Sequence, residues 1–99
     1  MIVEHAVLSV KAGQEAAFEA AMRAALPLVA ATPGFLGIEV RLCIEAAGKY
    51  LLLVQWETVE AHTQGFRQSD RYTEWKRDLH HFYDPFPLVE HYGAPVAAA

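Results

Sequence analysis

Two stretches of this chain are rich in β-branched and apolar residues, and this pattern constrains the fold more than any other feature of the sequence. They cover residues 2–10 and 49–57, and neither alternates strictly between apolar and polar residues. Strands of this composition are buried on both faces of a sheet. A further strand is predicted over 35–44, and it should pair with 49–57 as a hairpin because only the short connection 45–48 separates them.

Helical spacing of apolar residues covers most of the remaining chain. An amphipathic helix is predicted over 14–31, although Pro27 lacks an N–H group and should kink or stop the helix near it. A second helical segment is predicted over 58–67 and a third through His81. The side chains that can accept from the first free N–H groups of these two segments are Thr58 for the second, and Ser69 or Asp70 for the third.

One short strand completes the pattern. Residues 84–87 (Asp-Pro-Phe-Pro) hold the backbone extended, 88–92 is the last strand, and 93–99 is a tail without periodicity. The predicted order is β-α-β-β-α-β, the split βαβ arrangement of ferredoxin-like α+β domains, with an antiparallel sheet. We expect a single domain over 1–99, with 1–92 as its core.

A domain of this kind carries its helices on one face of the sheet only. Because the strands have the composition of strands with two buried faces, the other face needs a cover, and a second copy of the sheet is the simplest one. A hydrophobic share of 54% is also high for 99 residues. We therefore expect a homodimer that associates through the sheet face.

Composition excludes several other classes of partner. The formal net charge is −4, and acids and bases are interleaved without a basic stripe, so nucleic acid is not expected as a partner. No segment reaches the roughly 20 apolar residues of a membrane span. The single cysteine, Cys43, has no second thiol for a disulfide or a metal pair, which suits a reducing compartment, and we expect a cytoplasmic protein.

Three segments resemble the antibiotic biosynthesis monooxygenase domain, and the resemblance extends over residues 1–92. They are EHAVLSVKAGQEAAFEAA near the start, the turn ATPGFLG, and WETVEAHTQGFRQSDRYTEW from Trp56 onward. The resemblance implies a dimeric α/β barrel. The family contains cofactor-free oxygenases of phenolic or quinol substrates, haem-degrading enzymes, and members with no known activity.

The haem pattern of this family is not matched. The haem degraders carry an asparagine on the first strand, a tryptophan on the second helical segment and a histidine soon after it, and the corresponding positions here hold His5, Gly65 or Phe66, and Lys76. Haem stays a minor alternative, because His80 or His81 offers a ligand from a slightly different place. The resemblance otherwise implies that no cofactor is needed.

Histidine is the expected base for a cofactor-free oxygenation, since its ordinary pKa is about 6.5. His62 shares a helix face with apolar residues and should point toward the sheet, while His5 lies mid-strand where its ring can face the cleft between helices and sheet. The first and last strands are neighbours in this fold, which can bring His91 near His5. Each histidine can also be a buried residue that hydrogen-bonds to a carbonyl or carboxylate.

Aromatic residues after the third strand supply the other candidate groups. Trp56 and Tyr72 are candidate hydrogen-bond donors to a substrate oxygen, and Phe66 is a candidate wall. The same residues can instead pack the core. His80, His91 and Phe86 complete the predicted pocket, and Arg67 and Arg71 either meet an anionic substrate at its mouth or pair with surface acids. No metal site is expected, because no HxxxH or HxxE pair occurs on a helix.

The sequence thus predicts a cofactor-independent monooxygenase of a small aromatic substrate, with His5 or His62 as general base and Trp56 and Tyr72 as donors. The alternatives are a non-catalytic dimer that binds a small molecule in the same cavity, and a haem-binding or haem-degrading relative.

Overall fold

Four antiparallel strands form one sheet in the order β2-β3-β1-β4. A computed structural model describes residues 1–99. The predicted order of elements is confirmed, and their bounds are β1 Ile2–Ser9, α1 Glu15–Ala30, β2 Phe35–Leu42, β3 Lys49–Trp56, the π-helical η1 Ala61–Phe66, α2 Asp70–Leu79, the 3-10 turn η2 His80–Phe82, and β4 Val89–Tyr92. The hairpin of β2 with β3 and the pairing of β1 with β4 are both present.

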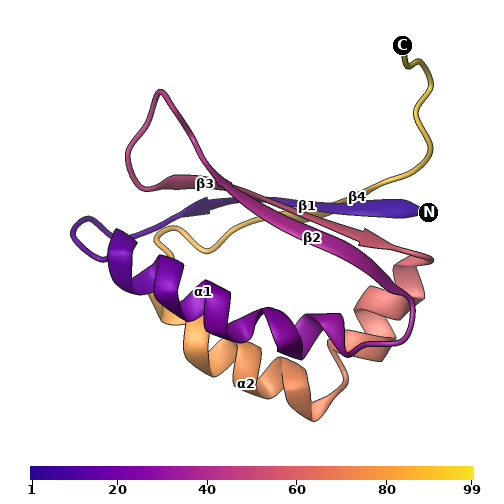
Figure 1. Ribbon diagram of the computed structural model, residues 1–99, viewed down its shortest axis with the longest axis horizontal. Helices are drawn as coiled ribbons and strands as arrows, with labels where there is room; N and C mark the ends of the chain where they lie inside the picture. The colour runs from indigo at the N-terminus through magenta and orange to yellow at the C-terminus, as the bar shows by residue number, and fades with distance from the viewer.

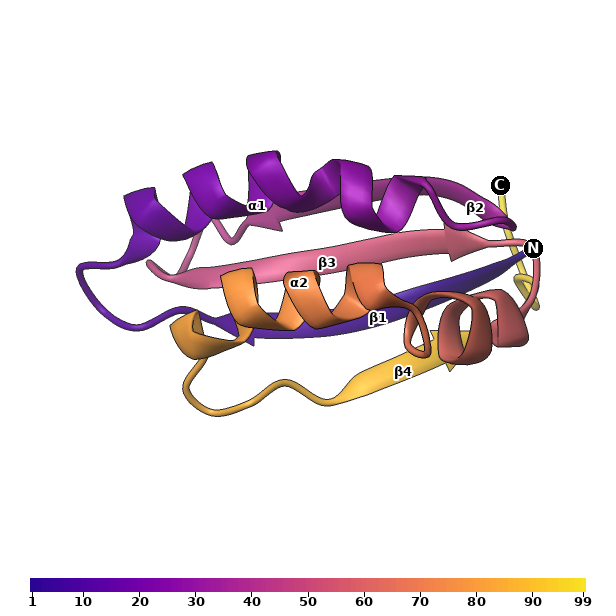
Figure 2. The ribbon, with the colours of Figure 1, turned by 90° about the horizontal axis from the view of Figure 1, so that it is seen from below.

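All helices lie on one face of the sheet. Figure 1 shows the two helices below the sheet, and Figure 2, seen from the helix side, shows α1 and α2 running beside each other across it. Successive side chains of a strand point to opposite faces, so Glu4, Ala6 and Leu8 of β1 are buried under the helices. His5 and Val7 point to the opposite surface of the sheet, which we call the open face.

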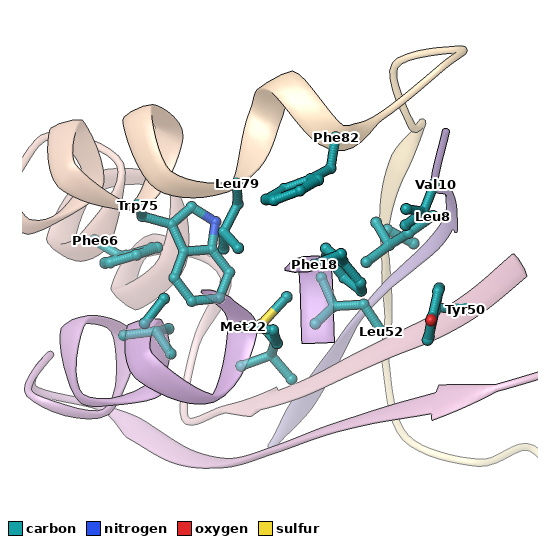
Figure 3. Packing of buried hydrophobic residues seen from close by; sticks show 14 of the residues in the cluster. Leu8, Val10, Phe18, Met22, Tyr50, Leu52, Phe66, Trp75, Leu79 and Phe82 are labelled. Carbon is teal, nitrogen blue, oxygen red and sulfur yellow. The ribbon is translucent and has the colours of Figure 1, made fainter. Parts of the chain in front are cut away.

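Apolar side chains from both layers fill the space between helices and sheet. Phe18 and Met22 of α1 meet Trp75 and Leu79 of α2 above the strand residue Leu52, as Figure 3 shows. Burying a Leu, Phe or Met side chain contributes about 1.5–3 kcal/mol each. This layer holds the helices in place and thereby positions the groups described below.

The segment between β3 and α2 is mainly π-helical, whereas an ordinary helix was predicted. Thr58 caps it as predicted, since its Oγ1 accepts from the N–H group of Ala61 at 3.1 Å. The following turns are π-helical, and the N–H group of Arg67 donates to the carbonyl of His62, five residues earlier, at 3.0 Å. The wider turn ends before Ser69, whose side chain accepts from the N–H group of Tyr72 and caps α2.

Helix α1 does not stop at Pro27, and it continues to Ala30. The proline removes one N–H group from the helix, but its own carbonyl still accepts from the N–H group of Ala31 at 3.2 Å. Packing of Ala25 and Val29 against the core compensates for the missing bond. None of the helices is long and apolar enough to cross a membrane.

Arg71 joins the start of α2 to the end of α1. Its Nε donates to the carbonyl of Leu28 at 3.1 Å, and its Nη2 donates to Oγ1 of Thr32, which is buried, at 3.1 Å. Leu28 lies in the last turn of α1, and Thr32 lies just after the end of this helix. The guanidinium is therefore a structural link between the helices, and it does not meet a substrate at the cavity mouth.

Replacing Arg71 by methionine should lower the free energy of unfolding by about 2–3 kcal/mol, because hydrogen bonds to a charged group are stronger than neutral ones and the buried Thr32 hydroxyl loses its partner. The midpoint of urea unfolding measures the change. The matched control is Arg77→Met on the exposed surface of α2, where Arg77 contacts only Glu74 and Asp78 and the loss should stay below about 0.5 kcal/mol. Equal losses in both variants would contradict the structural role of Arg71.

Candidate active site

A cavity of about 400 Å³ lies between the sheet and the second half of the helical layer. Strands β1 and β3 form its floor, and η1, α2 and the segment before β4 form its walls. This volume lies within the range of small-molecule pockets. The walls are mainly apolar and aromatic, and they include Leu52, Val54, Phe66, Trp75, Phe86 and Leu88.

Glu4 is the one acid in this lining. It occupies the middle of β1, and only 7% of its surface is exposed. Its Oε1 accepts from Nε1 of Trp56 at 3.0 Å and lies 3.3 Å from Nε2 of His62. Burial raises the pKa of the Glu4 carboxyl above its ordinary value, although the hydrogen bond from Trp56 and the charge of Arg67 act in the other direction.

The second carboxylate oxygen of Glu4 is free. Oε2 forms no hydrogen bond with the chain, and it is not among the side-chain atoms that are sealed without a partner. Glu4 itself belongs to the cavity lining. A ligand in the cavity would therefore meet an unpaired carboxylate oxygen.

His62 lies beside this carboxyl on η1, with 3% of its surface exposed. Its ring stacks on the indole of Trp56, with centroids 5.3 Å apart and planes 20° apart. Its Nδ1 lies 2.8 Å from Nε2 of His91 on β4, within hydrogen-bond distance. Burial, the charge of Arg67 and His91 lower the pKa of His62 to about 3, so the imidazole is neutral at ordinary pH.

Several other polar groups line the cavity. Arg67 follows η1, is exposed, and forms no ion pair or hydrogen bond through its side chain. Tyr72 and His80 contact each other edge to face, with centroids 6.0 Å apart. Burial raises the pKa of Tyr83, so that phenol stays protonated, and burial lowers the pKa of His80. The cavity thus combines a carboxyl, a free cation and neutral donors.

Most of the pocket residues predicted from the sequence lie around this cavity. The expected orientation of His62 toward the sheet is confirmed. The lining includes His62, Phe66, Tyr72, His80 and Phe86. His91 lies directly behind His62 and does not belong to the lining.

The expectation that His5 faces the cleft is wrong. The alternation along β1 buries Glu4 and Ala6 under the helices and turns His5 to the open face, where its ring contacts Tyr92 at 5.6 Å between centroids. His91 is opposite Glu4 in the ladder, and Glu90 is opposite His5, so His5 and His91 point to opposite faces. As a base for chemistry in the cavity, His5 is on the wrong side of the sheet.

Of the two roles that the sequence left open for Trp56, core packing is confirmed and donation to a substrate is not supported. Trp56 is 0% exposed, and its N–H group already donates to Glu4. In this arrangement Trp56 positions the carboxyl and has no free donor for a substrate. The sequence interpretation missed Glu4. The available signal was an acid inside an apolar strand, because a carboxyl is buried there only with polar partners.

Comparison with known families decides the membership of the chain. Residues 1–78 match the model of a family described as antibiotic biosynthesis monooxygenase. The chain belongs to the antibiotic biosynthesis monooxygenase family. The ferredoxin-like α+β fold of a single subunit, expected from the sequence, is thereby confirmed.

Relatives of this family member share both sequence and shape with it. YczJ of Bacillus subtilis, a protein of uncharacterised function, is 50% identical over 92 residues, which cover 93% of this chain and 97% of YczJ. A candidate antibiotic biosynthesis monooxygenase from Bordetella bronchiseptica is 37% identical with a TM-score of 0.90, over 96% of this chain and 97% of that one. A candidate from Nitrosomonas europaea, 18% identical with a TM-score of 0.81 over 95% and 98%, shares the fold.

The buried imidazole of this family member predicts an acid-sensitive stability. The folded-state pKa of His62 is about 3 and the ordinary value is 6.5, so the unfolded chain binds a proton in this interval that the folded chain does not. The contribution of His62 is present above pH 6.5 and is lost as the pH falls toward 3, by up to about 1.4 kcal/mol per pH unit. Urea unfolding of the wild type and of His62→Phe between pH 7 and 4.5 measures it.

In His62→Phe, which keeps a ring stacked on Trp56, the free energy of unfolding should fall less steeply with acidification than in the wild type. The raised pKa of Glu4 acts with the opposite sign, since its destabilisation grows as the pH rises above 4.5. His81→Gln, a change at an exposed histidine, should keep the wild-type slope. Parallel curves for all three proteins would show that His62 is not the acid-sensitive group.

Proposed function

We propose that this protein is a cofactor-independent monooxygenase that oxidises a small phenolic or quinol-type substrate in the cavity, as one subunit of a homodimer. The single observation that carries the proposal is the buried Glu4 carboxyl, which lines an apolar, aromatic-walled cavity and whose Oε2 has no partner in the chain. An electron-rich aromatic substrate supplies its own electrons to oxygen once a base has removed its proton. Such a reaction asks the protein for a base, an apolar pocket and groups that stabilise an oxyanion.

Glu4 is the proposed general base, and it takes the place of the histidines expected from the sequence. Burial raises its pKa, so its carboxylate is a stronger base than one in water. The N–H group of Trp56 fixes Oε1 by a hydrogen bond at 3.0 Å, and Nε2 of neutral His62 lies 3.3 Å from the same oxygen. These two contacts leave Oε2 to approach the substrate hydroxyl.

The proposed reaction balances without any other reactant. Glu4 takes the phenol proton, and the phenolate transfers an electron to dioxygen. The resulting radical pair forms a C–O bond at a ring carbon that carries hydrogen. Protonation gives a hydroperoxide, the ring C–H proton leaves, and the O–O bond breaks to give a quinone and one water molecule. One phenol and one dioxygen are consumed for each quinone and water.

Two other groups in the cavity lining can stabilise the negatively charged phenolate. Arg67 has no acid partner in the chain, so its guanidinium is free to attract a phenolate. The hydroxyl of Tyr72 forms no hydrogen bond with the chain and is the proposed donor to a substrate oxygen. Phe66 and Trp75, with ring centroids 5.6 Å apart and nearly perpendicular planes, provide flat apolar walls for an aromatic ring.

The open face supports the dimer part of the proposal. Its centre is apolar, with Val3, Val7, Leu51 and Leu53 from β1 and β3, and Val7 is 39% exposed. No helix covers this surface in Figure 1. The Nδ1 of His5 is also sealed there without a hydrogen-bond partner. A second sheet packed against this face would bury the apolar centre, as sheets do at a separation of about 10 Å.

Glu4→Gln should lower the rate of oxygen uptake by about 100-fold or more, since general-base catalysis contributes about 10²–10⁴. The amide oxygen still accepts from Trp56, so the fold is retained while the base is lost. An oxygen electrode with a panel of dihydroxyaromatic substrates, without added metal or cofactor, measures the rate. The matched control is Glu74→Gln on the exposed surface of α2, which should keep the wild-type rate.

The same panel separates the alternatives. Saturable binding of an aromatic compound, with no oxygen uptake by the wild type, would replace the enzyme by a binding protein. A Soret band formed on titration with haem, again without uptake, would favour the haem alternative. Equal uptake by wild type and Glu4→Gln would remove Glu4 as the base.

Leu51→Asp should convert a dimer into a monomer, because a charge at the centre of the open face cannot be buried against a second sheet without several kcal/mol of desolvation cost. Size-exclusion chromatography with light scattering measures the mass. The matched control is Arg23→Asp on the exposed surface of α1, on the opposite side of the molecule, which should remain dimeric. A wild type that is monomeric at micromolar concentration would end the dimer proposal.

A further inference from the structure

A chain of titratable side chains leads from the cavity to the edge of the sheet. It begins at Glu4 on the cavity floor, continues through His62 and ends at His91 on β4, the edge strand next to β1. We propose that this chain is a proton-transfer path, and that His91 exchanges protons between solvent and the cavity carboxyl. The inference rests on the proposed function of Glu4 and adds His91 as a residue that acts through it.

The geometry gives each step a short distance. Oε1 of Glu4 and Nε2 of His62 are 3.3 Å apart, within ion-pair distance but slightly longer than an ordinary N–H···O hydrogen bond, so a small approach of the two groups is needed for transfer. Nδ1 of His62 and Nε2 of His91 are 2.8 Å apart. Both nitrogens of the His62 ring are thus engaged, one toward the carboxyl and one toward the second ring, as an imidazole that relays protons requires.

The outer end of the path is open. Nδ1 of His91 has no partner in the chain, and it is not among the atoms sealed from solvent. His91 is half-buried and does not line the cavity, so this nitrogen reaches the outside and not the substrate space. By contrast, Nδ1 of His5, one strand position from Glu4, is sealed and without a partner.

Both imidazole rings are neutral before and after one proton has moved from Glu4 to solvent. In the protonated state, Glu4 holds a proton on its carboxyl, and each imidazole holds its proton on Nδ1. The carboxyl group, protonated by the substrate on Oε2, first turns about its Cγ–Cδ bond so that the protonated oxygen faces Nε2 of His62. Its proton then passes to Nε2 of His62, the Nδ1 proton of His62 passes to Nε2 of His91, and the Nδ1 proton of His91 leaves to solvent. The product is a carboxylate with each ring protonated on Nε2. The carboxylate then accepts from His62, and His62 accepts from His91.

The proposed reaction requires a proton to leave the cavity at one stage and to return at a later one. After Glu4 has taken the substrate proton, the neutral acid stands beside a phenolate, and return of the proton competes with electron transfer to dioxygen. Export through His91 removes that proton and keeps the phenolate charged beside Arg67. Transport in the reverse direction supplies the proton that the peroxide needs to leave as water.

The charges around the path come from three elements. Glu4 faces it from β1, His62 faces it from η1, and Arg67 faces it from the turn after η1 and helps to keep both rings neutral. Glu90 and Tyr92, the neighbours of His91 on β4, point to the open face. No lysine or further acid contacts either ring.

His91→Ala should lower the rate of oxygen uptake at least tenfold in dilute buffer, and added imidazole should restore a large part of the loss by entering the vacated space. A merely structural role of His91 would not respond to imidazole. The control is His81→Ala, a change at an exposed histidine outside the path, which should keep the wild-type rate with or without imidazole.

A second measurement needs no turnover. Nitrogen-15 NMR of labelled histidines distinguishes the two neutral tautomers and the charged ring. As the Glu4 carboxyl is titrated, His62 and His91 should change from Nδ1–H to Nε2–H together, and in His91→Ala the tautomer change at His62 should shift to a different pH.

The outcomes separate this inference from the proposed function. Loss of rate in His91→Ala with rescue by imidazole, together with a joint tautomer change, supports the path. Wild-type rates in His91→Ala, or tautomers of the two rings that change independently, overturn it. If the wild type oxidises no substrate, the proposed function fails, and the NMR titration alone decides whether the path exists.

Discussion

The burial of one carboxyl is the constraint on which the rest of the site depends. Glu4 is desolvated in the middle of an apolar strand, and such a group is tolerated only when polar partners reach it. The indole N–H group of Trp56 and the ring of His62 provide these partners, and they come from β3 and η1. The same desolvation that would destabilise the fold also raises the pKa of the carboxyl and makes it a base.

The sheet order determines which groups can join this carboxyl. Because β1 lies between β3 and β4, Glu4 has neighbours on both sides, Trp56 near the end of one strand and His91 directly opposite on the other. The π-helical η1 then brings His62 over the carboxyl, between the indole and the second imidazole. The contacts of the carboxyl, the aromatic packing and the line of groups toward the edge of the sheet are therefore consequences of one arrangement of strands.

Sequence patterns predicted the elements well where the pattern has a direct physical cause. The cap at Thr58 was predicted, and Ser69 was one of two candidates with Asp70, because short polar side chains satisfy free N–H groups at a helix start. The effect of Pro27 was overestimated, since core packing on both sides of it holds α1 together as far as Ala30. The π-helical form of η1 was not predicted, because the shift from four-residue to five-residue bonding has no marker in residue type.

What the sequence by itself determined is the composition of the layers: which segments are strands, which are helices, and that the chain has more apolar strand surface than its own helices cover. Only the tertiary structure decided the side of the sheet on which each residue of β1 lies. In a strand without strict alternation, residue type does not distinguish the two faces, and a shift by one residue exchanges them. For this reason Glu4 is the group that faces the cavity, and His5, its neighbour in the chain, faces away from it.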